Sequence, residues 1–113
     1  MSSLSNKSCV PCRGGIPPLT ENDYEPLLTE LGDGWEVIDT HHLEKTILLK
    51  NFAEALTFTN QVGSIAEKEG HHPDIELGWG RVKIIIWTHK IDGLSESDFI
   101  LAAKISAIGK IAA

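Results

Sequence analysis

The chain has 113 residues and a formal net charge of -6 at pH 7, which is typical of one domain with a single core. The sequence has no basic cluster, and its negative net charge argues against direct binding to nucleic acid or to an anionic membrane. Because no stretch approaches the roughly 20 apolar residues of a spanning helix and no signal-peptide pattern opens the chain, we expect a cytoplasmic protein.

Residues 1–18 are rich in Ser, Gly and Pro and predict a flexible N-terminal tail before a domain at 19–113. The tail contains Cys9-Val10-Pro11-Cys12. A tetrahedral zinc site needs four ligands, and a redox C-x-x-C normally opens a helix, whereas glycine and proline follow this one. We therefore expect two free thiols. A metal shared with other ligands or another subunit, and a disulfide, are the alternatives.

A first helix is predicted to run to about Leu31, with Thr20 or Asp23 as its N-cap. Pro26 is tolerated best in a first turn, which favours the later start near Asp23. One face of this helix is apolar and consists of Tyr24, Leu27, Leu28 and Leu31.

Two strands are predicted next, at residues 35–40 and 43–50, after the helix-breaking glycines of Gly32-Asp33-Gly34. The turn between them holds His41 and His42. No proline follows this pair, so we expect both to be exposed turn residues.

A central helix is predicted from Asn51, the N-cap, to Glu69, because Glu54 follows Asn51 at capping-box spacing. Gly70 is placed to end it in the left-handed conformation. The helix carries a broad apolar stripe, made of Phe52, Ala55, Leu56, Phe58, Thr59, Val62, Ile65 and Ala66.

The next predicted element is a hairpin, with strands at residues 74–77 and 81–88 and a turn at Gly78-Trp79-Gly80. A last helix follows, capped by Ser95 or Ser97. Its buried face is marked by Leu101, Ile105, Ile108 and Ala112.

The order helix, two strands, helix, two strands, helix favours an α+β domain, in which three helices pack on one face of a four-stranded antiparallel sheet. The strand at 82–88 has apolar residues on both parities, including Ile84 and Ile85. Helices explain one covered face, and the other implies a ligand cleft or a second subunit.

Candidate catalytic residues gather around the predicted hairpin. His71 and His72 precede Pro73, which forces His72 toward extended backbone, so the pair should lie on a fixed corner. Glu67 lies one helical turn before His71. Pairing of the two hairpin strands should bring His89 back toward this corner. Three imidazoles close together can give and take protons at neutral pH.

These residues and their spacing resemble the pterin-4a-carbinolamine dehydratase family. The resemblance covers roughly residues 19–112, including Gly34-Trp35 and Gly93-Leu94-Ser95-Glu96. The family's pattern of a polar residue, a His-His-Pro, an aromatic residue, a further His and an Asp is matched at every interval by Glu67, His71-His72-Pro73, Trp79, His89 and Asp98.

The resemblance implies dehydration of a 4a-hydroxytetrahydropterin to the quinonoid dihydropterin, which recycles a tetrahydropterin cofactor without a metal or redox cofactor. It implies that His71 and His89 act on the leaving hydroxyl, while His72 binds the pterin or takes the N5 proton. Glu67 would fix the tautomer of a neighbouring imidazole. Asp98 either orients His89 or caps the last helix. The candidate pterin-binding residues are Trp79, Trp35 and Pro73.

Other functions use the same residues or the same fold. Zinc held by His71, His72 and His89 is one alternative, although adjacent side chains in extended backbone point to opposite sides. A non-catalytic role, as an assembly factor or a dimerisation cofactor, is another. The resemblance also implies a homodimer or homotetramer, with an aromatic amino acid hydroxylase or another protein as a possible partner.

Overall fold

The computed structural model describes residues 4–9 and 16–112, so Cys12 lies outside the described residues. The helices and strands follow the predicted order. Two short 3-10 helices, η1 (Leu4–Asn6) and η2 (His89–Ile91), accompany them. The main elements are α1 (Glu21–Leu31), β1 (Glu36–Ile38), β2 (His42–Leu48), α2 (Phe52–Glu69), β3 (Asp74–Gly78), β4 (Arg81–Ile86) and α3 (Glu96–Ala112).

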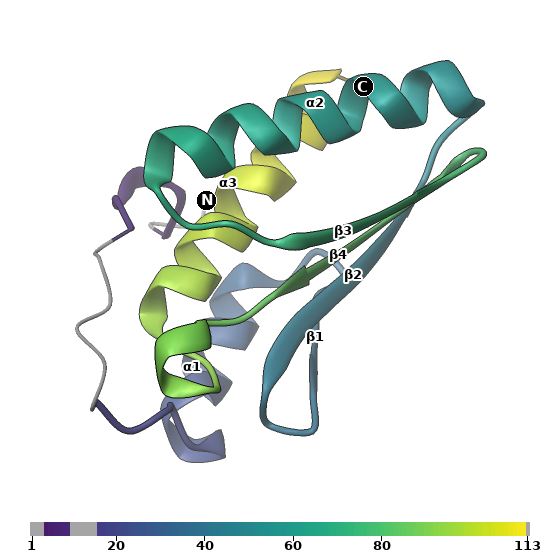
Figure 1. Cartoon of the computed structure of the whole chain (residues 1–113). Coiled ribbons are helices and arrows are strands. Elements are labelled where there is room, and N and C mark those ends of the chain that lie inside the picture. The colour runs from purple at the N-terminus through teal and green to yellow at the C-terminus, as the bar shows by residue number, and fades with distance from the viewer. Residues whose placement is uncertain (1–3, 10–15, 113) are drawn as a thin grey trace.

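The four strands form one antiparallel sheet in the order β1-β2-β4-β3. Helix α2 runs along the sheet and contacts β3 and β4, and α3 lies between α2 and α1 (Figure 1). The predicted α+β architecture, with the helices on one face of the sheet, is confirmed. The sheet also brings the residues before β3 and after β4 to the same end of the molecule, because these two strands are paired.

The core lies between the sheet and the helices. Strand β4 alternates as predicted for a strand with one covered face: Val82, Ile84 and Ile86 are fully buried, whereas Ile85 and Trp87 are half-buried on the other parity. The largest fully buried apolar side chains are Phe99, Leu4, Leu43, Ile84, Ile86, Leu94, Leu101, Ile105, Val62 and Val82.

Helix α2 has the predicted ends. The Asn51 side chain accepts a hydrogen bond from the Glu54 N–H at 2.9 Å, and Gly70 closes the helix in the left-handed region with φ 67°. The predicted apolar stripe is wider than the face that α2 buries. Phe52 and Leu56 are 46% and 43% exposed, so only part of the stripe faces the core.

Helix α1 begins earlier than Pro26 suggested, and the preferred start near Asp23 is wrong. Its first residue is Glu21, and the Asp23 carboxylate accepts hydrogen bonds from both the N–H and the hydroxyl of Thr20, at 2.9 Å each. The Thr20 N–H also lowers the pKa of the Asp23 carboxyl. Pro26 therefore lies inside the helix, where it cannot donate to the carbonyl of Asn22.

The β1–β2 turn differs from the sequence prediction. Strand β1 is only three residues long, and the chain turns through Asp39 and Thr40, which both have positive φ. His42 belongs to β2 instead of the turn, and both His41 and His42 are half-buried. Their prediction as exposed turn residues is wrong, because His41 contacts Trp87 and Asp92 in the segment that follows β4.

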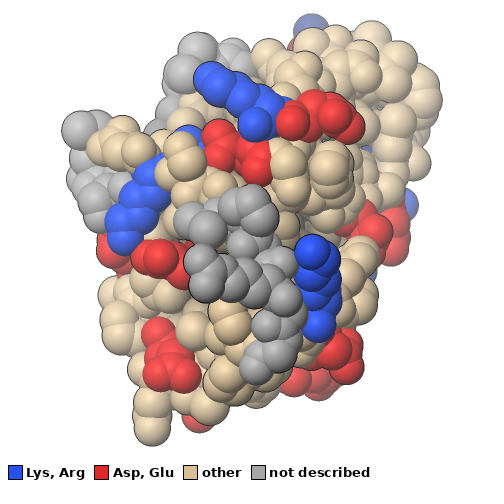
Figure 2. Space-filling model, turned by 60° about the vertical axis from the view of Figure 1, so that its left-hand side comes forward, with Lys and Arg blue, Asp and Glu red and all other residues tan. Residues whose placement is uncertain are grey.

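The N-terminal residues that the structure describes pack on the domain. Leu4 is 1% exposed and belongs to the core, and η1 lies against α3 (Figure 1). Residues 4–9 of the predicted tail therefore pack against the core and α3. Figure 2 shows acidic and basic side chains mixed on the face that carries this segment. No helix within the described residues is long and apolar enough to cross a membrane.

Candidate active site

The end of α2 places two histidines on a corner of the chain. Gly70 donates its N–H to the Ala66 carbonyl, and the His71 N–H reaches the same oxygen at 3.2 Å. Pro73 then directs the chain into β3. The corner that the sequence predicted is therefore present, and it fixes the backbone of His71 and His72.

His71 is bound to a buried carboxylate. Its Nε2 lies 2.5 Å from Oδ1 of Asp98, which is 0% exposed, and the His71 side chain itself is 17% exposed. A carboxylate only accepts hydrogen bonds, so this contact places a ring proton on Nε2 and leaves Nδ1 as the nitrogen that can exchange one. The contact is of the charge-assisted kind.

The other oxygen of Asp98 is also fully used. It accepts a hydrogen bond from the Thr88 hydroxyl at 2.9 Å and from the Ser95 N–H at 2.8 Å, at the start of α3. Asp98 thus caps α3, which was one of its two predicted roles. The histidine that it orients is His71, whereas the sequence spacing had suggested His89. The chain turns into η2 directly after Thr88, so Thr88 takes the place beside Asp98 that His89 was expected to hold.

His72 lies beside Glu67, as the helical spacing suggested for one histidine of the pair. Its Nε2 is 3.3 Å from the Glu67 carboxylate, and the two side chains are 59% and 82% exposed. Exposed pairs of this kind contribute little to stability. Glu67 can therefore bias the orientation of His72 but does not lock it, and its partner is His72 instead of His71.

His89 is exposed and is held by ring contacts. Its imidazole centroid lies 4.0 Å from the Trp87 ring, and the His41 ring lies 4.5 Å from the same tryptophan. His41 is tied in turn to Asp92, with Nε2 2.8 Å from Oδ1. The β1–β2 turn thereby supports the segment that carries His89.

The three histidines line one cleft of about 340 Å³. This volume is at the small end of the range for ligand pockets and suits a compact ring system. The predicted convergence of His89 on His71 and His72 is confirmed. The lining residues are Gly70, His71, His72, Trp87, Thr88, His89 and Lys90.

The predicted aromatic residues lie elsewhere. Trp35 is 5% exposed and donates its Nε1–H to the Ser106 hydroxyl at 2.8 Å, as a core residue does. Trp79 is 74% exposed in the turn between β3 and β4, at the opposite end of the hairpin from His71. Pro73 borders a neighbouring open groove together with His72. Neither tryptophan lines the histidine cleft of its own chain.

Sequence reasoning missed Trp87, Thr88 and Lys90, which also line the cleft. Trp87 forms its wall, and Thr88 connects that wall to Asp98. Thr88 is a polar residue that is only 4% exposed at the end of an apolar run, and a buried hydroxyl must find a hydrogen-bond partner. That position directly before His89 was the available signal.

The arrangement supports proton transfer more directly than metal binding. Among the described residues, no three histidine, cysteine or carboxylate side chains are grouped so that they could hold a metal ion. The cleft instead presents one histidine fixed by a buried carboxylate and two exposed histidines. Such groups can act as general acids and bases when their nitrogens reach a substrate.

Comparison with known proteins places the chain among pterin dehydratases. The family model described as pterin 4 alpha carbinolamine dehydratase matches residues 17–108. Two bacterial relatives, both provisionally named pterin-4-alpha-carbinolamine dehydratase, are similar over nearly their full lengths. The one from Rubrobacter xylanophilus is 55% identical and covers 96% of this chain and 100% of its own, and that from Alkaliphilus metalliredigens is 54% identical over 93% and 95%.

Two solved structures share the fold. A transcriptional coactivator/pterin dehydratase from Brucella melitensis is 34% identical, with a TM-score of 0.75 over 80% of this chain and 97% of the other. A pterin dehydratase-like protein identified as a RuBisCO assembly factor is 21% identical, with a TM-score of 0.58 over 69% and 92%. The second likeness shows the fold alone.

Proposed function

The chain belongs to the pterin 4 alpha carbinolamine dehydratase family, and on this premise we propose that it dehydrates a 4a-hydroxytetrahydropterin to the quinonoid dihydropterin. The observation that carries the proposal is the convergence of His71, His72 and His89 on one cleft, with the buried Asp98 behind His71. Histidines with a fixed carboxylate partner are the groups that an acid-base elimination of water requires.

The chemistry needs two proton movements. The hydroxyl on C4a is a poor leaving group until it gains a proton, and N5 must lose one. The lone pair of the ring nitrogen can expel the water, so proton transfer alone completes the reaction. Each positioned proton transfer is typically worth about 10²- to 10⁴-fold in rate.

His71 and His89 are the proposed proton-transfer groups at the leaving hydroxyl, one from each side of the pterin ring. Asp98 holds the His71 proton on Nε2 and leaves Nδ1 as the nitrogen that exchanges a proton with the substrate. His89 lines the same cleft and rests against Trp87. His72, which is more exposed, is proposed to bind the pterin or to take the N5 proton.

We also propose that the protein works as a homodimer or homotetramer. Ile85 and Trp87 are half-buried on the sheet parity opposite the core, and Leu48 and Trp79 are 79% and 74% exposed. A specific interface normally buries about 1,200 Å² or more in total, and these side chains would form the apolar centre of such a surface. Sedimentation at micromolar concentration should give a dimer or tetramer, and a strict monomer contradicts the proposal.

A binding role without catalysis is the alternative. The name of the Brucella relative joins a coactivator to a dehydratase, and the RuBisCO assembly factor shares only the fold. A protein that only binds a partner has no need of a buried carboxylate that fixes a cleft histidine. The cluster of His71, Asp98 and His89 therefore favours the enzyme.

The test is a dehydration assay on 4a-hydroxytetrahydropterin generated by a hydroxylase in the same cuvette. The purified protein should accelerate formation of the quinonoid dihydropterin above the spontaneous rate. Activity should also persist after dialysis against a chelator, since proton transfer needs no metal. A rate equal to the spontaneous one rejects the enzyme reading, and activity that disappears on chelation and returns with zinc supports a three-histidine metal site.

A further inference from the structure

We infer that residues 4–9, called the N-terminal brace below, form a positioning element for the His71–Asp98 pair. The kinetic part of this inference rests on the proposed function, whereas its structural part does not. The brace lies outside the residues 17–108 that the family model matches. It contacts the two chain segments that carry His71 and Asp98.

The brace is anchored at its first residue. Leu4 is buried in the core, and the Ser5 carbonyl accepts a hydrogen bond from the Lys104 ammonium of α3 at 3.0 Å. The 3-10 helix η1 lies along α3 (Figure 1). These contacts fix the beginning of the brace to the helix that carries Asp98.

Cys9, at the other end of the brace, joins the supports of the catalytic pair. Its N–H donates to Oε1 of Glu69 at 2.8 Å, and its thiol lies 3.5 Å from the Ser97 carbonyl oxygen. Glu69 is the last residue of α2 and is separated from His71 by Gly70 alone. Ser97 is the residue directly before Asp98. One cysteine therefore bridges the two segments at the points where they deliver His71 and Asp98.

Glu69 lies where a carboxylate needs a hydrogen-bond donor. Its side chain is only 9% exposed and stands at the C-terminus of a helix, where the helix dipole disfavours a negative charge. Its partners are the Cys9 N–H and the Lys104 ammonium at 3.7 Å. The Cys9 N–H is the main cause of the lowered pKa of Glu69. The brace thus supplies the hydrogen bond that an acidic residue needs at this position.

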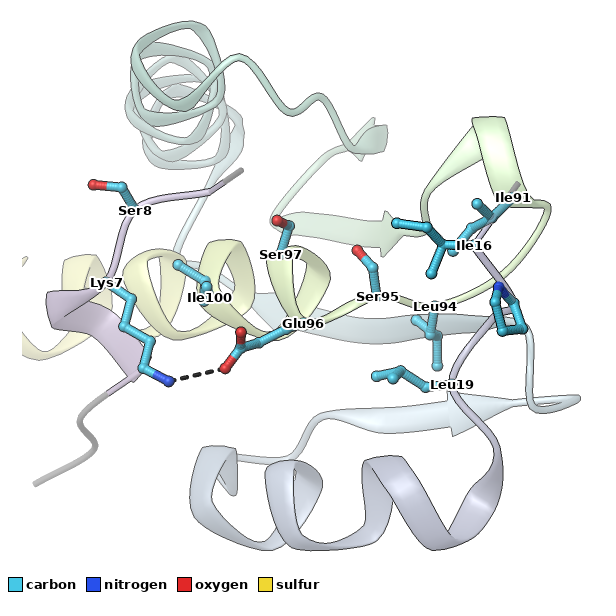
Figure 3. Close-up of a pocket in the computed structure, with 11 residues that line it drawn as sticks. Lys7, Ser8, Ile16, Leu19, Ile91, Leu94, Ser95, Glu96, Ser97 and Ile100 are labelled. Atoms are coloured by element: carbon cyan, nitrogen blue, oxygen red, sulfur yellow. Dashed lines mark hydrogen bonds and ion pairs between the residues drawn. The ribbon is translucent and has the colours of Figure 1, made fainter. Parts of the chain in front are cut away.

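A second stretch of the N-terminal segment supports the same region. The Leu19 N–H donates to the Leu94 carbonyl at 2.9 Å, and a Cβ at Gly93 would lie 2.6 Å from Pro18. Between this stretch and the brace lies a hollow of about 530 Å³ over the start of α3, where Lys7 pairs with Glu96 at 2.8 Å (Figure 3). The first turn of α3, which contains Asp98, is therefore held by the contact of Cys9 with Ser97 on one side and by the bond of Leu19 to Leu94 on the other, whereas the half-exposed Lys7–Glu96 pair adds little.

The thiol reports whether the brace is docked. Burial, helped by the nearby Glu69 carboxylate, raises the pKa of Cys9 to about 12. The thiolate is the nucleophile that reacts with alkylating reagents, so docked Cys9 should react slowly at neutral pH. Release of the brace returns the thiol to water and should speed its alkylation. The reaction is measured in a Cys12→Ser background, which leaves one cysteine in the chain.

The test compares Glu69→Ala with Glu69→Gln. Alanine removes the acceptor of the Cys9 N–H, whereas glutamine keeps an amide oxygen there and loses only the charge. In Glu69→Ala, we expect Cys9 to be alkylated at least about threefold faster than in wild type. We also expect kcat to fall about 3- to 10-fold with KM unchanged, because a misplaced catalytic pair loses rate before it loses binding. Glu69→Gln should restore most of kcat. Its alkylation rate also reflects the lost carboxylate, which helps to raise the Cys9 pKa, so the alkylation comparison that decides is Leu4→Ala, which keeps Glu69.

The control and a second variant separate positioning from stability. Lys7→Ala removes the half-exposed pair with Glu96 in the same segment and should leave alkylation and kcat unchanged. Leu4→Ala releases the brace at its other end and should reproduce the effects of Glu69→Ala. If Glu69→Ala does not fold, Leu4→Ala decides the question, measured below its own melting temperature.

A readout independent of activity is the ring N–H proton of His71 in NMR spectra. Its exchange with water should be slow in wild type and faster in Glu69→Ala and Leu4→Ala, since both loosen the contact with Asp98. Faster alkylation with an unchanged His71 signal and unchanged kcat overturns the inference, and so does unchanged alkylation in both variants. If wild type has no dehydratase activity, the proposed function fails, and the His71 signal alone still decides the role of the brace.

Discussion

The two walls of the histidine cleft are built by different means. On one wall, His71 is largely buried and held by a carboxylate whose two oxygens make three hydrogen bonds. On the other wall, His89 is exposed and rests on Trp87 through a tilted ring contact. Hydrogen bonds to a buried carboxylate fix both direction and protonation, whereas ring contacts fix neither closely.

The two histidines are therefore held with different firmness. The His71 wall holds one proton and one lone pair at a set place before substrate arrives, which is the preorganisation that proton transfer requires. The ring contact of His89 with Trp87 sets no such proton position. Variants of the two walls should therefore differ in the size of their effect and in whether stability changes with activity.

The largest loss is expected for His71→Ala. The change removes a proton-transfer group from the fixed wall, and kcat for dehydration should fall about 100-fold. The quantity to measure is kcat under conditions where dehydration limits the coupled hydroxylase assay. Turnover within about twofold of wild type would show that the fixed wall takes no part in proton transfer.

A smaller kinetic loss with a clear loss of stability is expected for Asp98→Asn. The amide keeps the shape, but its NH2 group faces donors where a carboxylate oxygen accepted their hydrogen bonds, from Thr88, Ser95 or His71. We expect kcat to fall about 30-fold and the free energy of unfolding to fall by on the order of 2 kcal/mol. Urea unfolding followed by circular dichroism measures the second quantity. Wild-type stability would mean that the buried network is not formed.

His89→Ala should lower kcat about tenfold without a loss of stability. The side chain is exposed, so its removal leaves no cavity and no unpaired buried group. The same assay and the same urea titration apply. A loss of kcat larger than that of His71→Ala would reverse the ranking of the two walls.

The smallest effect is expected for His41→Ala, which removes one of the two rings that contact Trp87 and frees Asp92. Such ring contacts are worth about 0.5–1.5 kcal/mol, so kcat should fall only about two- to fivefold. Thr46→Ala, at an exposed position on β2, the strand that follows His41, is the matched control and should be silent. An effect of His41→Ala as large as that of His89→Ala would make His41 part of the catalytic group.

Local signals in the sequence predicted much of the fold. Asn51 with Glu54 and the left-handed Gly70 defined α2 to the residue, because caps and C-terminal glycines act within a few positions. The start of α1 was missed since the rule for Pro26 was weighed above the Thr20–Asp23 bonds, which hold the first turn. Neighbouring residues decide such ends, and two local rules can disagree.

The three histidines of the site were predictable from the sequence, whereas their hydrogen-bond partners were not. Hairpin pairing correctly brought His89 to His71 and His72. The partner of Asp98 lies 27 positions away, and its choice between His71 and His89 depends on how η2 turns the chain, which no spacing rule describes. The contact of Cys9 with Glu69, 60 positions apart, was invisible for the same reason.

The most direct test of histidine catalysis is the rate at which 4a-hydroxytetrahydropterin disappears in the presence of the His71→Ala/His89→Ala double variant. Since His71 and His89 are the proposed proton-transfer groups at the leaving hydroxyl, we expect the folded double variant to return the rate to within about threefold of the spontaneous reaction, far below wild type. A folded double variant that dehydrates the substrate at the wild-type rate would contradict proton transfer by these histidines.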